Sequence, residues 1–529
     1  MRRGKLNGRC GALRAVSGGL SVLMLLTLAG CAVGPNYQEP AINAPEKWLD
    51  AQGEAKKATD ATNAALTTWW KQLSDAQLDK VMDLALRGNL DLKLAEARVK
   101  QVRALRQGAA SGLLPTIDAT SGYQRREDSP NVGAGLGNAG GFGRSGDAYN
   151  SWSAGFESSW ELDFFGRVRR GVEGAEGDLQ SAEFEARDVL VALTGEVARN
   201  YAELRTNQQR LEITLGNLKT QEETLALSTS RFDAGLTSEL DVVRARANVE
   251  TTRSAIPSLQ SAVRASIHRL GLLTGQAPGA LIAELSVAGR IPEPSGAVDA
   301  GVPSELLKRR PDLRSIERQL AAQTARIGVA TADLYPRITL GGSVGWNASK
   351  IATLFDASSV TYGIGPSVSW NIFDYGRIRS NIAAQGAAAE QILVRYERAV
   401  LSAFVEVENA LVSYTNEKVR RTSLRDAVAA GLRSVELSTE LYKQGLTDFN
   451  AVLDAQRQLF LLQDTLMQSE GTVAANFITL NTALGGGWDP RGDLRSAVIQ
   501  PTAKENSAGG STWQPAGAVP GNKSEPTAK

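Results

Sequence analysis

Two periods of hydrophobicity divide most of the chain into helices and strands. Stretches compatible with a helix follow Gly166 and Gly376 and run to Gly235 and Gly445. Each is ~68 residues long, which makes a rod of roughly 100 Å at about 1.5 Å per residue. We expect helices over residues 89–113, 167–234, 238–272, 304–334, 377–444 and 448–484.

Four shorter segments alternate with period two and are expected to be strands: residues 116–125, 150–164, 337–347 and 360–374. The clearest is VTYGIGPSVSWNIF, in which Tyr362, Ile364 and Val368 lie on one face and glycine and serine on the other. Period two over roughly ten residues, with aromatic residues near the ends, is typical of a transmembrane strand. A half-buried sheet of a soluble protein has the same period.

The first residues have the form of an export signal. A basic start, MRRGKLNGRC, precedes an apolar stretch that ends in LLTLAGC. This form predicts a signal peptide over residues 1–30, and Leu28 to Cys31 resembles the bacterial lipobox, in which the cysteine is lipidated. The alternative is an ordinary signal peptide in which the cysteine occurs by chance. Ala32 is not the aspartate that retains lipoproteins in the inner membrane, so we expect an outer-membrane protein anchored through Cys31. The predicted export to the outer membrane favours the interpretation that the four strands span a membrane.

The chain contains one long unit twice. WELDFFGRVRR begins at 160 and WNIFDYGRIRS at 370, an offset of 370 minus 160, or 210. Upstream, LDLKLAEARV at 90 corresponds to PDLRSIERQL at 311, an offset of 311 minus 90, or 221. The difference falls on a glycine-rich loop insertion in the first copy, NVGAGLGNAGGFGRSG. We therefore expect an anchored segment at 31–88, a first repeat at 89–274, a connector at 275–303 and a second repeat at 304–487.

The composition leaves little chemistry for catalysis or for metals. Charge is balanced, with 58 basic and 57 acidic residues, so no global field argues for nucleic acid. The single histidine, His268, lies in a helix-like segment, and there are only two cysteines. A catalytic triad, a Cys-His pair or a histidine-based metal site would each need His268. We expect no enzyme, no cofactor and no metal site.

Two repeats supply four membrane strands, which is too few for a closed structure. An open sheet in lipid leaves unpaired backbone groups at its edges, each at a cost of several kcal/mol. Single-chain barrels begin at about eight strands. We therefore expect three copies to assemble and to provide twelve strands, with the long helices forming a hollow tube below.

Four motifs carry a family resemblance: CAVGPNYQEP at 31, GVPSELLKRRPDLRSIERQL at 301, ELDFFGRVRR at 161 and ALGGGW at 483. With them the chain resembles the outer membrane factors of the TolC superfamily, in particular the NodT/OprM-like lipoproteins. The resemblance implies a homotrimer with a 12-stranded β-barrel continued by a periplasmic α-helical barrel. It also implies a passive exit duct that serves a periplasmic adaptor and an inner-membrane pump, in a proton-driven efflux system. The tail, 488–529, is expected to be disordered.

The resemblance further implies a gate at the periplasmic end. The aspartate and arginine that family members carry near the constriction match Asp454 and Arg457. The apolar gate residue of the family corresponds to Asn450, and we expect the neighbouring Phe449 to contribute in its place. The alternative is that these charges are ordinary solvated positions of a helix.

The helices turn at two glycines, Gly235 and Gly445, which are expected to be helix C-caps. Thr447 or Asp448 can cap the returning helix. By resemblance, the turns meet the adaptor, and we expect Leu236 and Leu446 to make that contact rather than only to pack the turn. The predicted tip residues are Gly235, Leu236, Thr237, Gly445, Leu446 and Thr447.

Two other functions stay open at this stage. The same duct could serve type I protein secretion, because the pump selects the substrate. A trimeric periplasmic scaffold without a pore is the second alternative, and the four alternating strands speak against it.

Overall fold

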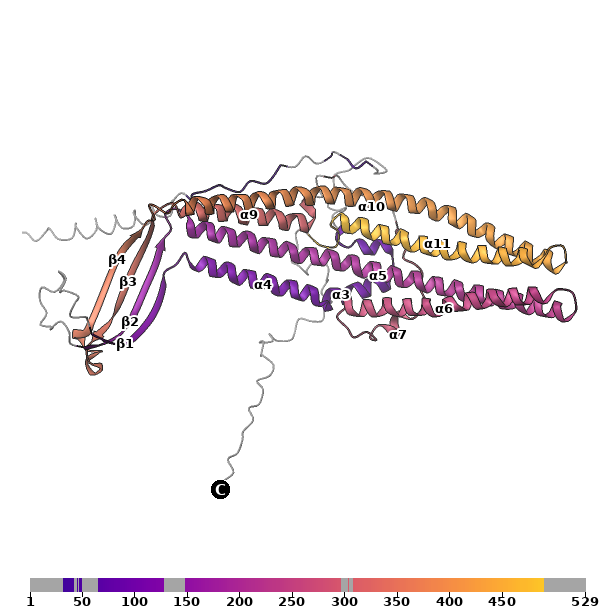
Figure 1. Cartoon of the computed structure of the whole chain (residues 1–529), viewed down its shortest axis with the longest axis horizontal. Helices are drawn as coiled ribbons and strands as arrows, with labels where there is room; N and C mark the ends of the chain where they lie inside the picture. Colours follow the sequence, from indigo (N-terminus) through magenta and orange to yellow (C-terminus); the bar gives the residue numbers. More distant parts are fainter. Residues whose placement is uncertain are drawn as a thin grey trace, which may run out of the picture.

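The fold was obtained as a computed structural model that describes residues 32–41, 45, 47–49, 65–127, 148–295, 303 and 308–489. The molecule is elongated, with a small sheet at one end and two helical hairpins at the other (Figure 1). The expected mixed α and β fold is confirmed. The signal peptide and the predicted lipidation site, Cys31, lie outside the described residues.

Each repeat contributes one short helix, two strands, one long helix and one return helix. The strands are β1 (Thr116–Arg126), β2 (Tyr149–Leu162), β3 (Arg337–Ala348) and β4 (Val360–Ser369). The large helices are α4 (Leu90–Ser111), α5 (Arg167–Asp233), α6 (Glu239–Leu273), α9 (Pro311–Ala332), α10 (Arg377–Lys443) and α11 (Phe449–Ala483). Smaller elements are η1 (Trp69–Leu73), α3 (Ala76–Gly88), α7 (Ile282–Leu285), η2 (Ile351–Thr353) and η3 (Ala357–Ser359).

The large helices form one layer with a fixed lateral order. Helices α4 and α6 both pack on α5, α5 packs on α9 and α11, and these two pack on α10. The short helices α4 and α6 thus share one side of α5, and α9 and α11 share the other. The layer therefore reads α4/α6, α5, α9/α11, α10, and it is open at α4/α6 and at α10.

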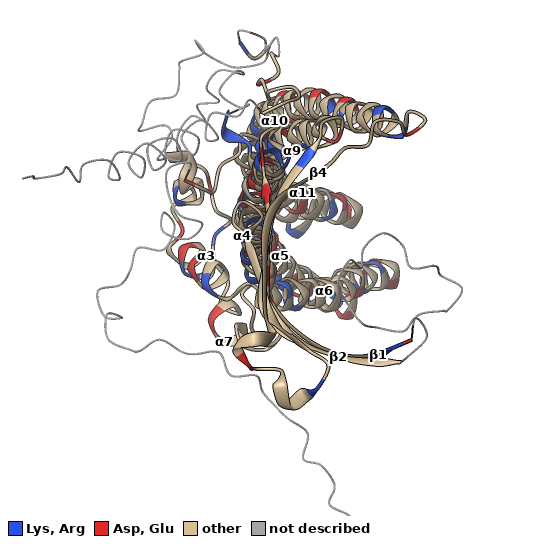
Figure 2. Cartoon of the chain, turned by 90° about the vertical axis from the view of Figure 1, so that its left-hand side faces the viewer, with Lys and Arg blue, Asp and Glu red and all other residues tan. Residues whose placement is uncertain are grey.

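The strands form one antiparallel sheet in the order β1-β2-β3-β4. Its register brings apolar residues from all four strands to the same face, because Tyr123 pairs with Trp152, Phe156 with Val344 and Val344 with Tyr362. The opposite face carries serine, threonine, glycine and a few charged residues. Figure 2 shows how few charges the sheet has compared with the helices. An exposed apolar face of this size marks contact with lipid or another protein.

Both junctions between sheet and helices use the same contact. The indole Nε1 of Trp160 donates to the carbonyl oxygen of Leu113, and Nε1 of Trp370 donates to that of Leu334, each over 3.0 Å. These carbonyls lie just beyond the ends of α4 and α9. The repeated bond fixes the direction in which the sheet leaves the helical layer in each copy.

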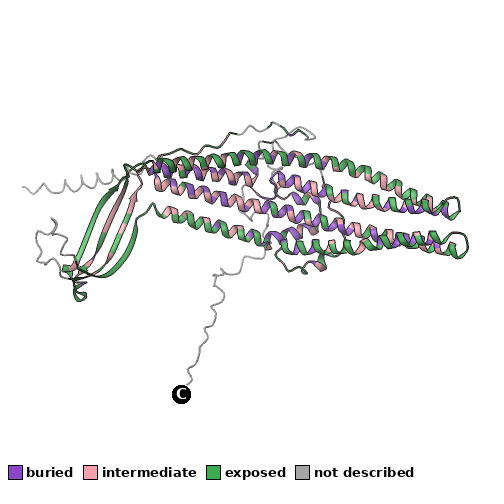
Figure 3. Ribbon diagram, viewed as in Figure 1, coloured by how far each residue is buried: buried purple, intermediate pink, exposed green. Residues whose placement is uncertain are grey.

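The main hydrophobic core lies halfway along the helices, where the small elements cover one face of the layer (Figure 3). Trp69 of η1 contacts Phe477 of α11 edge to face, with ring centroids 6.3 Å apart. Tyr201 of α5 donates to Asp75, which also caps α3 by accepting from two backbone N–H groups. Burial here is much denser than at the sheet or at the hairpin ends, so this belt holds the helices in register.

Three sequence predictions need correction. Strand β4 ends at Ser369 rather than near 374, because Ser369 pairs with Arg337, the first residue of β3, and no partner strand remains beyond it. Helix α9 begins at Pro311 rather than near 304, since proline lacks an N–H and suits the first turn. Trp488, expected in a disordered tail, is buried, and its Nε1 donates to the carbonyl of Arg309 over 3.1 Å.

None of the helices that the structure describes is both long and apolar enough to cross a membrane.

Asp188 of α5 gives a pH-dependent test of the packing where α9 and α11 meet. Burial raises the pKa of Asp188 from 3.8 to about 6, Asp312 raises it further, and Arg310 opposes the rise. The folded state thus holds this proton more tightly, so stability falls as pH rises from about 4 to about 6 and stays reduced above.

We predict that Asp188→Asn stabilises the protein at pH 7.5 by about 1–3 kcal/mol, since one pKa unit is worth about 1.4 kcal/mol. At pH 4 the gain is expected to vanish. Thermal unfolding of the detergent-solubilised protein at both pH values measures this, with Asp426→Asn, an exposed aspartate of α10, as the matched control. An equal effect of Asp188→Asn at both pH values would contradict the assignment.

Candidate functional site

Both hairpin turns have the same backbone geometry. Gly235 and Gly445 adopt left-handed φ angles of 70° and 73°. Leu236 N–H donates to the Arg231 carbonyl over 2.8 Å, and Leu446 N–H donates to the Leu441 carbonyl over 2.9 Å. These six-to-one bonds, with the glycine in the left-handed region, define a Schellman C-cap. A side chain at either glycine would meet no neighbour, so φ alone requires glycine there.

The return helices start differently in the two copies. Asp448 caps α11 by accepting a hydrogen bond from the backbone N–H of Ala451 over 3.2 Å. In the first copy Ser238 makes no such side-chain bond, and the Thr237 hydroxyl instead donates to Asp241. Of the two residues proposed to cap α11, Asp448 therefore does so and Thr447 does not.

The tip leucines point into solvent. Leu236 is 65% exposed and Leu446 is 69% exposed. Leu240 and Val243, in the first turns of α6, are also more than half exposed. The turns themselves are held by backbone bonds, so these leucines are not needed to pack them.

The residues predicted to form a gate separate into two groups. Asn450, Asp454 and Arg457 lie on one exposed face of α11, as their spacing of four and three predicts. Phe449, which we expected to help occlude the passage, is only 2% exposed. Its ring contacts Tyr442 of α10 with centroids 5.3 Å apart, inside a small cluster between the hairpins. The expectation for Phe449 was therefore wrong: its side chain packs the hairpin and does not face a passage.

The exposed face of α11 is connected to the neighbouring α6. Arg244 Nη1 donates to the Asn450 side-chain oxygen over 2.7 Å, and Arg457 Nε donates to that of Asn248 over 3.2 Å. Asp454 makes no hydrogen bond or ion pair within the part of the chain that the structure describes. Asp454 and Arg457 thus share a face without pairing with each other.

Sequence reasoning missed Arg244 and Asn248 as partners of this face. A signal was present for Arg244, because the two copies differ in charge at that position, whereas Asn248 has an amide, Gln458, as its counterpart. Arg244 corresponds to Asp454, and Ala247 corresponds to Arg457. Positions at which a repeated helix changes charge between its copies are candidates for contacts made by one copy only.

Further polar contacts join α5 to α11 along the halves of these helices that lie nearer the hairpin turns. Arg210 forms a bidentate ion pair with Asp464, with N–O distances of 2.6 and 3.2 Å. Closer to the tips, Asn217 donates to Gln463 over 2.7 Å, and the buried Gln456 donates to Thr224 over 2.8 Å.

At the tip itself, Arg231 reaches the second hairpin. It donates to the carbonyl of Lys443 over 3.2 Å, and its guanidinium lies over the ring of Tyr442, 4.9 Å from the centroid. The two hairpins of one chain are thus connected by polar contacts from the middle of the helices to their ends.

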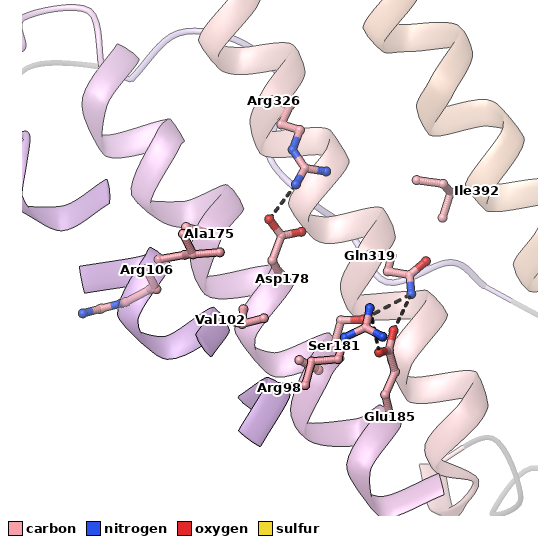
Figure 4. Close-up of a pocket in the computed structure, with 12 residues that line it drawn as sticks. Arg98, Val102, Arg106, Ala175, Asp178, Ser181, Glu185, Gln319, Arg326 and Ile392 are labelled. Atoms are coloured by element: carbon pink, nitrogen blue, oxygen red, sulfur yellow. Dashed lines mark hydrogen bonds and ion pairs between the residues drawn. The ribbon is translucent and has the colours of Figure 1, made fainter. Parts of the chain in front are cut away.

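A cavity of about 420 Å³ lies between α4, α5, α9 and α10, nearer the sheet (Figure 4). Its three arginines already have acidic partners: Arg106 lies 2.9 Å from Glu176, Arg326 lies 2.5 Å from Asp178, and Arg98 lies 3.6 Å from Glu185. Asp178 and Glu185 line the groove beside their partners, and Glu176 neutralises Arg106, so the groove offers no uncompensated arginine to a ligand. Its ion pairs serve to hold α4 and α9 against α5.

The part of the chain that the structure describes contains no group of three or more His, Cys, Asp or Glu side chains arranged to hold a metal ion. The molecule thus combines a long helical layer with a sheet that has one polar and one apolar face. Two exposed turns lie at the end of the helices away from the sheet.

Comparison with known proteins identifies the family to which the chain belongs. A model of the family described as outer membrane efflux protein matches the chain twice, at residues 81–276 and 302–486. This confirms the two internal repeats.

Two relatives illustrate the similarity in sequence. Nodulation protein T of Rhizobium leguminosarum bv. trifolii is 31% identical over 465 residues, which covers 88% of this chain and 96% of that protein. The toluene efflux pump outer membrane protein TtgI of Pseudomonas putida is 32% identical over 482 residues and covers 89% and 98%.

Solved structures agree in fold. The outer-membrane channel OprN has a TM-score of 0.79 at 33% identity and covers 87% of this chain and 100% of its own. CusC, for which crystal structures describe folding and transmembrane channel formation, has a TM-score of 0.73 at 26% identity. The chain therefore belongs to the outer membrane efflux protein family and is a channel protein of the outer membrane whose helices extend into the periplasm.

Proposed function

We propose that three copies of this chain close edge to edge into the exit duct of a tripartite efflux system. The observation that carries this proposal is the coincidence of two open edges. The sheet ends at β1 and β4, and the helical layer ends at α4/α6 and α10. Since β1 follows α4 and β4 precedes α10, the open sheet edge and the open helical edge belong to the same side of the molecule at each end.

The need for neighbouring copies follows from backbone hydrogen bonding in lipid, and the number three follows from the width that a passage requires. Strands β1 and β4 each have one unpaired edge, and a β4-to-β1 contact between copies satisfies both at once. Such a head-to-tail contact closes only as a ring. One chain gives four strands and two give eight, whereas three give twelve, which is wide enough for a water-filled passage.

The two faces of the sheet support conduction through the ring. Apolar side chains such as Phe156, Tyr362 and Ile364 are exposed on one face and suit contact with lipid. Serine, threonine and glycine on the other face suit a water-filled interior. Nothing in this arrangement breaks a bond, so the duct is passive, and transport requires an adaptor and an inner-membrane pump as partners.

The exposed face of α11 is proposed to close the periplasmic end at rest. Asp454 and Arg457 are exposed in the single chain and lie two turns of helix from the tip. Three copies would bring three such faces together around one axis, and rings of charged groups are a recognised way to gate and select in pores. Asn450 adds an amide to this face, so the proposed closure is polar rather than an apolar plug.

The two hairpin turns are proposed to meet the adaptor. Leu236 and Leu446 are exposed while the backbone bonds at Gly235 and Gly445 hold the turns, which supports contact rather than packing. Thr237 and Thr447 flank these leucines and are only partly exposed. A trimer would present six such turns.

The proposed lipid anchor at Cys31 is supported by the position of the next residue. Ala32 packs against Gly166, at the junction of β2 and α5, so closely that a side chain on Gly166 would lie 2.7 Å from Ala32. Val33 N–H donates to the Phe165 carbonyl over 3.1 Å, and Tyr37 donates to the buried Glu317 of α9. An acyl chain on residue 31 would therefore start at the base of the sheet, at the level of the inner leaflet.

Conductance tests the duct and its gate together. In planar bilayers the purified protein is expected to form channels with a low resting conductance, and Asp454→Ala with Arg457→Ala is expected to raise that resting conductance several-fold. The control pair, Asp426→Ala with Arg433→Ala, removes the same charges from α10 and should leave it unchanged. No channels at all would contradict the duct, and an unchanged closed state would contradict the gate.

Lipidation is tested by metabolic labelling with palmitate. Cys31→Ser is expected to lose the label completely and to leave the signal peptide uncleaved, because no thiol remains to be acylated. Cys10→Ser, which changes the only other cysteine of the chain, should keep the label. Label retained by Cys31→Ser would refute the anchor.

A further inference from the structure

The loop between β3 and β4 lies at the end of the sheet away from the helices (Figure 1). Because the helices extend into the periplasm, this end of the sheet is on the outer side of the membrane. The loop contains a short apolar run, IATLF at 351–355. Ile351 is 62% exposed and Phe355 is 70% exposed, whereas Leu354 is buried. Two large apolar side chains of one loop are thus left without cover in the single chain.

The loop folds back along the sheet instead of projecting beyond it. Element η3 packs on β3, and the ring of Phe355 contacts that of Trp346 edge to face, with centroids 5.5 Å apart. Trp346 is not the last paired residue of β3, because Ala348 still pairs with Trp152 of β2. Two residues of a strand span about 7 Å. Phe355 therefore lies at the level of a paired row of the sheet, although it belongs to a loop.

The side of the sheet on which the loop lies follows from alternation along β3. Trp346 is two residues from Val344, so both side chains point to the same face. Val344 pairs with Tyr362, which belongs to the apolar face. The contact with Trp346 therefore places Phe355 on the apolar side of the sheet and not on the side of serine and glycine.

The distance along β3 places this contact near the edge of the apolar band. From Ile338, beside the helices, to Trp346 is 346 minus 338, or eight residues. Eight residues span ~27 Å along a strand, which is roughly 20 Å of height at a tilt of about 40°. The apolar band of a transmembrane barrel is about 25 Å tall, with aromatic residues at both boundaries. Trp346 and Phe355 thus lie close to the outer boundary.

The backbone of the loop is suited to such a boundary. Its N–H groups donate to carbonyls of the loop itself over 2.9–3.2 Å, at Thr353, Leu354, Asp356 and Ser359. The Ser359 hydroxyl also donates to the Thr353 carbonyl, over 2.7 Å. Backbone groups without a partner are costly next to hydrocarbon. These internal bonds lower that cost and give the loop a fixed shape.

We propose that the β3–β4 loop is an interfacial anchor that inserts Ile351 and Phe355 among the acyl chains of the outer leaflet. Lys350 is exposed immediately before the apolar run, where its ammonium group can meet the phosphates of the lipid head groups. Lipid is the partner because the exposed pair continues the apolar side of the sheet through Trp346. This inference rests on the lipid-facing sheet of the duct proposed above.

Spin labelling of the full-length protein in vesicles of phosphatidylcholine and phosphatidylglycerol tests the placement of the loop. Nitroxides at Ile351→Cys and Phe355→Cys are compared with two on β3: Val344→Cys on the apolar face and Ser343→Cys on the polar face. Power saturation measures collisions with oxygen, which is concentrated in lipid, and with a nickel chelate that stays in water. We expect the ratio of oxygen to nickel accessibility to be several-fold higher at residues 351 and 355 than at 343.

The two labels on β3 separate failure of the anchor from failure of the duct. Ratios at 351 and 355 as low as at 343 would place the loop in water and overturn the proposal. Low accessibility to both reagents would also overturn it, because a neighbouring chain would then cover the loop. A label at 344 that collides mainly with nickel would contradict the lipid-facing sheet, and with it the proposed duct on which the anchor depends.

A charge at the anchor tests the contribution of Phe355 itself. Adding Phe355→Asp to the protein labelled at Ile351→Cys is expected to lower the oxygen-to-nickel ratio about two-fold or more, because a carboxylate is disfavoured among acyl chains. Ser358→Asp, at an exposed position of the same loop, is the matched control and should leave the ratio unchanged. The same ratio in both variants would contradict the assignment of Phe355 as an anchoring residue.

Discussion

The unpaired backbone groups along β1 and β4 impose the requirement from which the remaining architecture follows. In lipid no water can satisfy these groups, so each edge must find another strand. A chain with four strands cannot close on itself, and the helical layer below the sheet ends on the same two sides. Edge pairing in the membrane and helix packing in the periplasm therefore demand the same head-to-tail neighbour.

Because the unit is repeated within the chain, similar contacts can form within one chain and between chains. Differences in sequence between the two copies make these two kinds of contact unequal. Both copies share the tryptophan bond at the junction of sheet and helices and the left-handed glycine at the turn. They differ where charge matters: Asp464 has Ser254 as its counterpart, and Arg231 has Leu441. In the proposed trimer, six similar hairpins would therefore make two kinds of contact, one within each chain and one between neighbouring chains.

The sequence predicted the elements well because their limits are set locally. Glycine at the turns and proline after the short helices fix helix ends, and alternation identifies the strands. The prediction from sequence failed where a residue far away in the chain sets the limit of an element. Strand β4 ends where β3 has no further residue to pair with it, and Trp488 is held by a hydrogen bond to the carbonyl of Arg309 in a remote segment. For the site, spacing placed Asn450, Asp454 and Arg457 on one face, but only packing could reveal that Phe449 turns inward toward Tyr442.

The central claim is that three chains close into one ring, and native mass spectrometry of the protein in detergent tests it most directly. The account predicts a dominant species with the mass of three mature chains, each bearing its lipid, which persists until the detergent is denaturing. A spectrum dominated by one or two chains under conditions that keep the fold intact would contradict it.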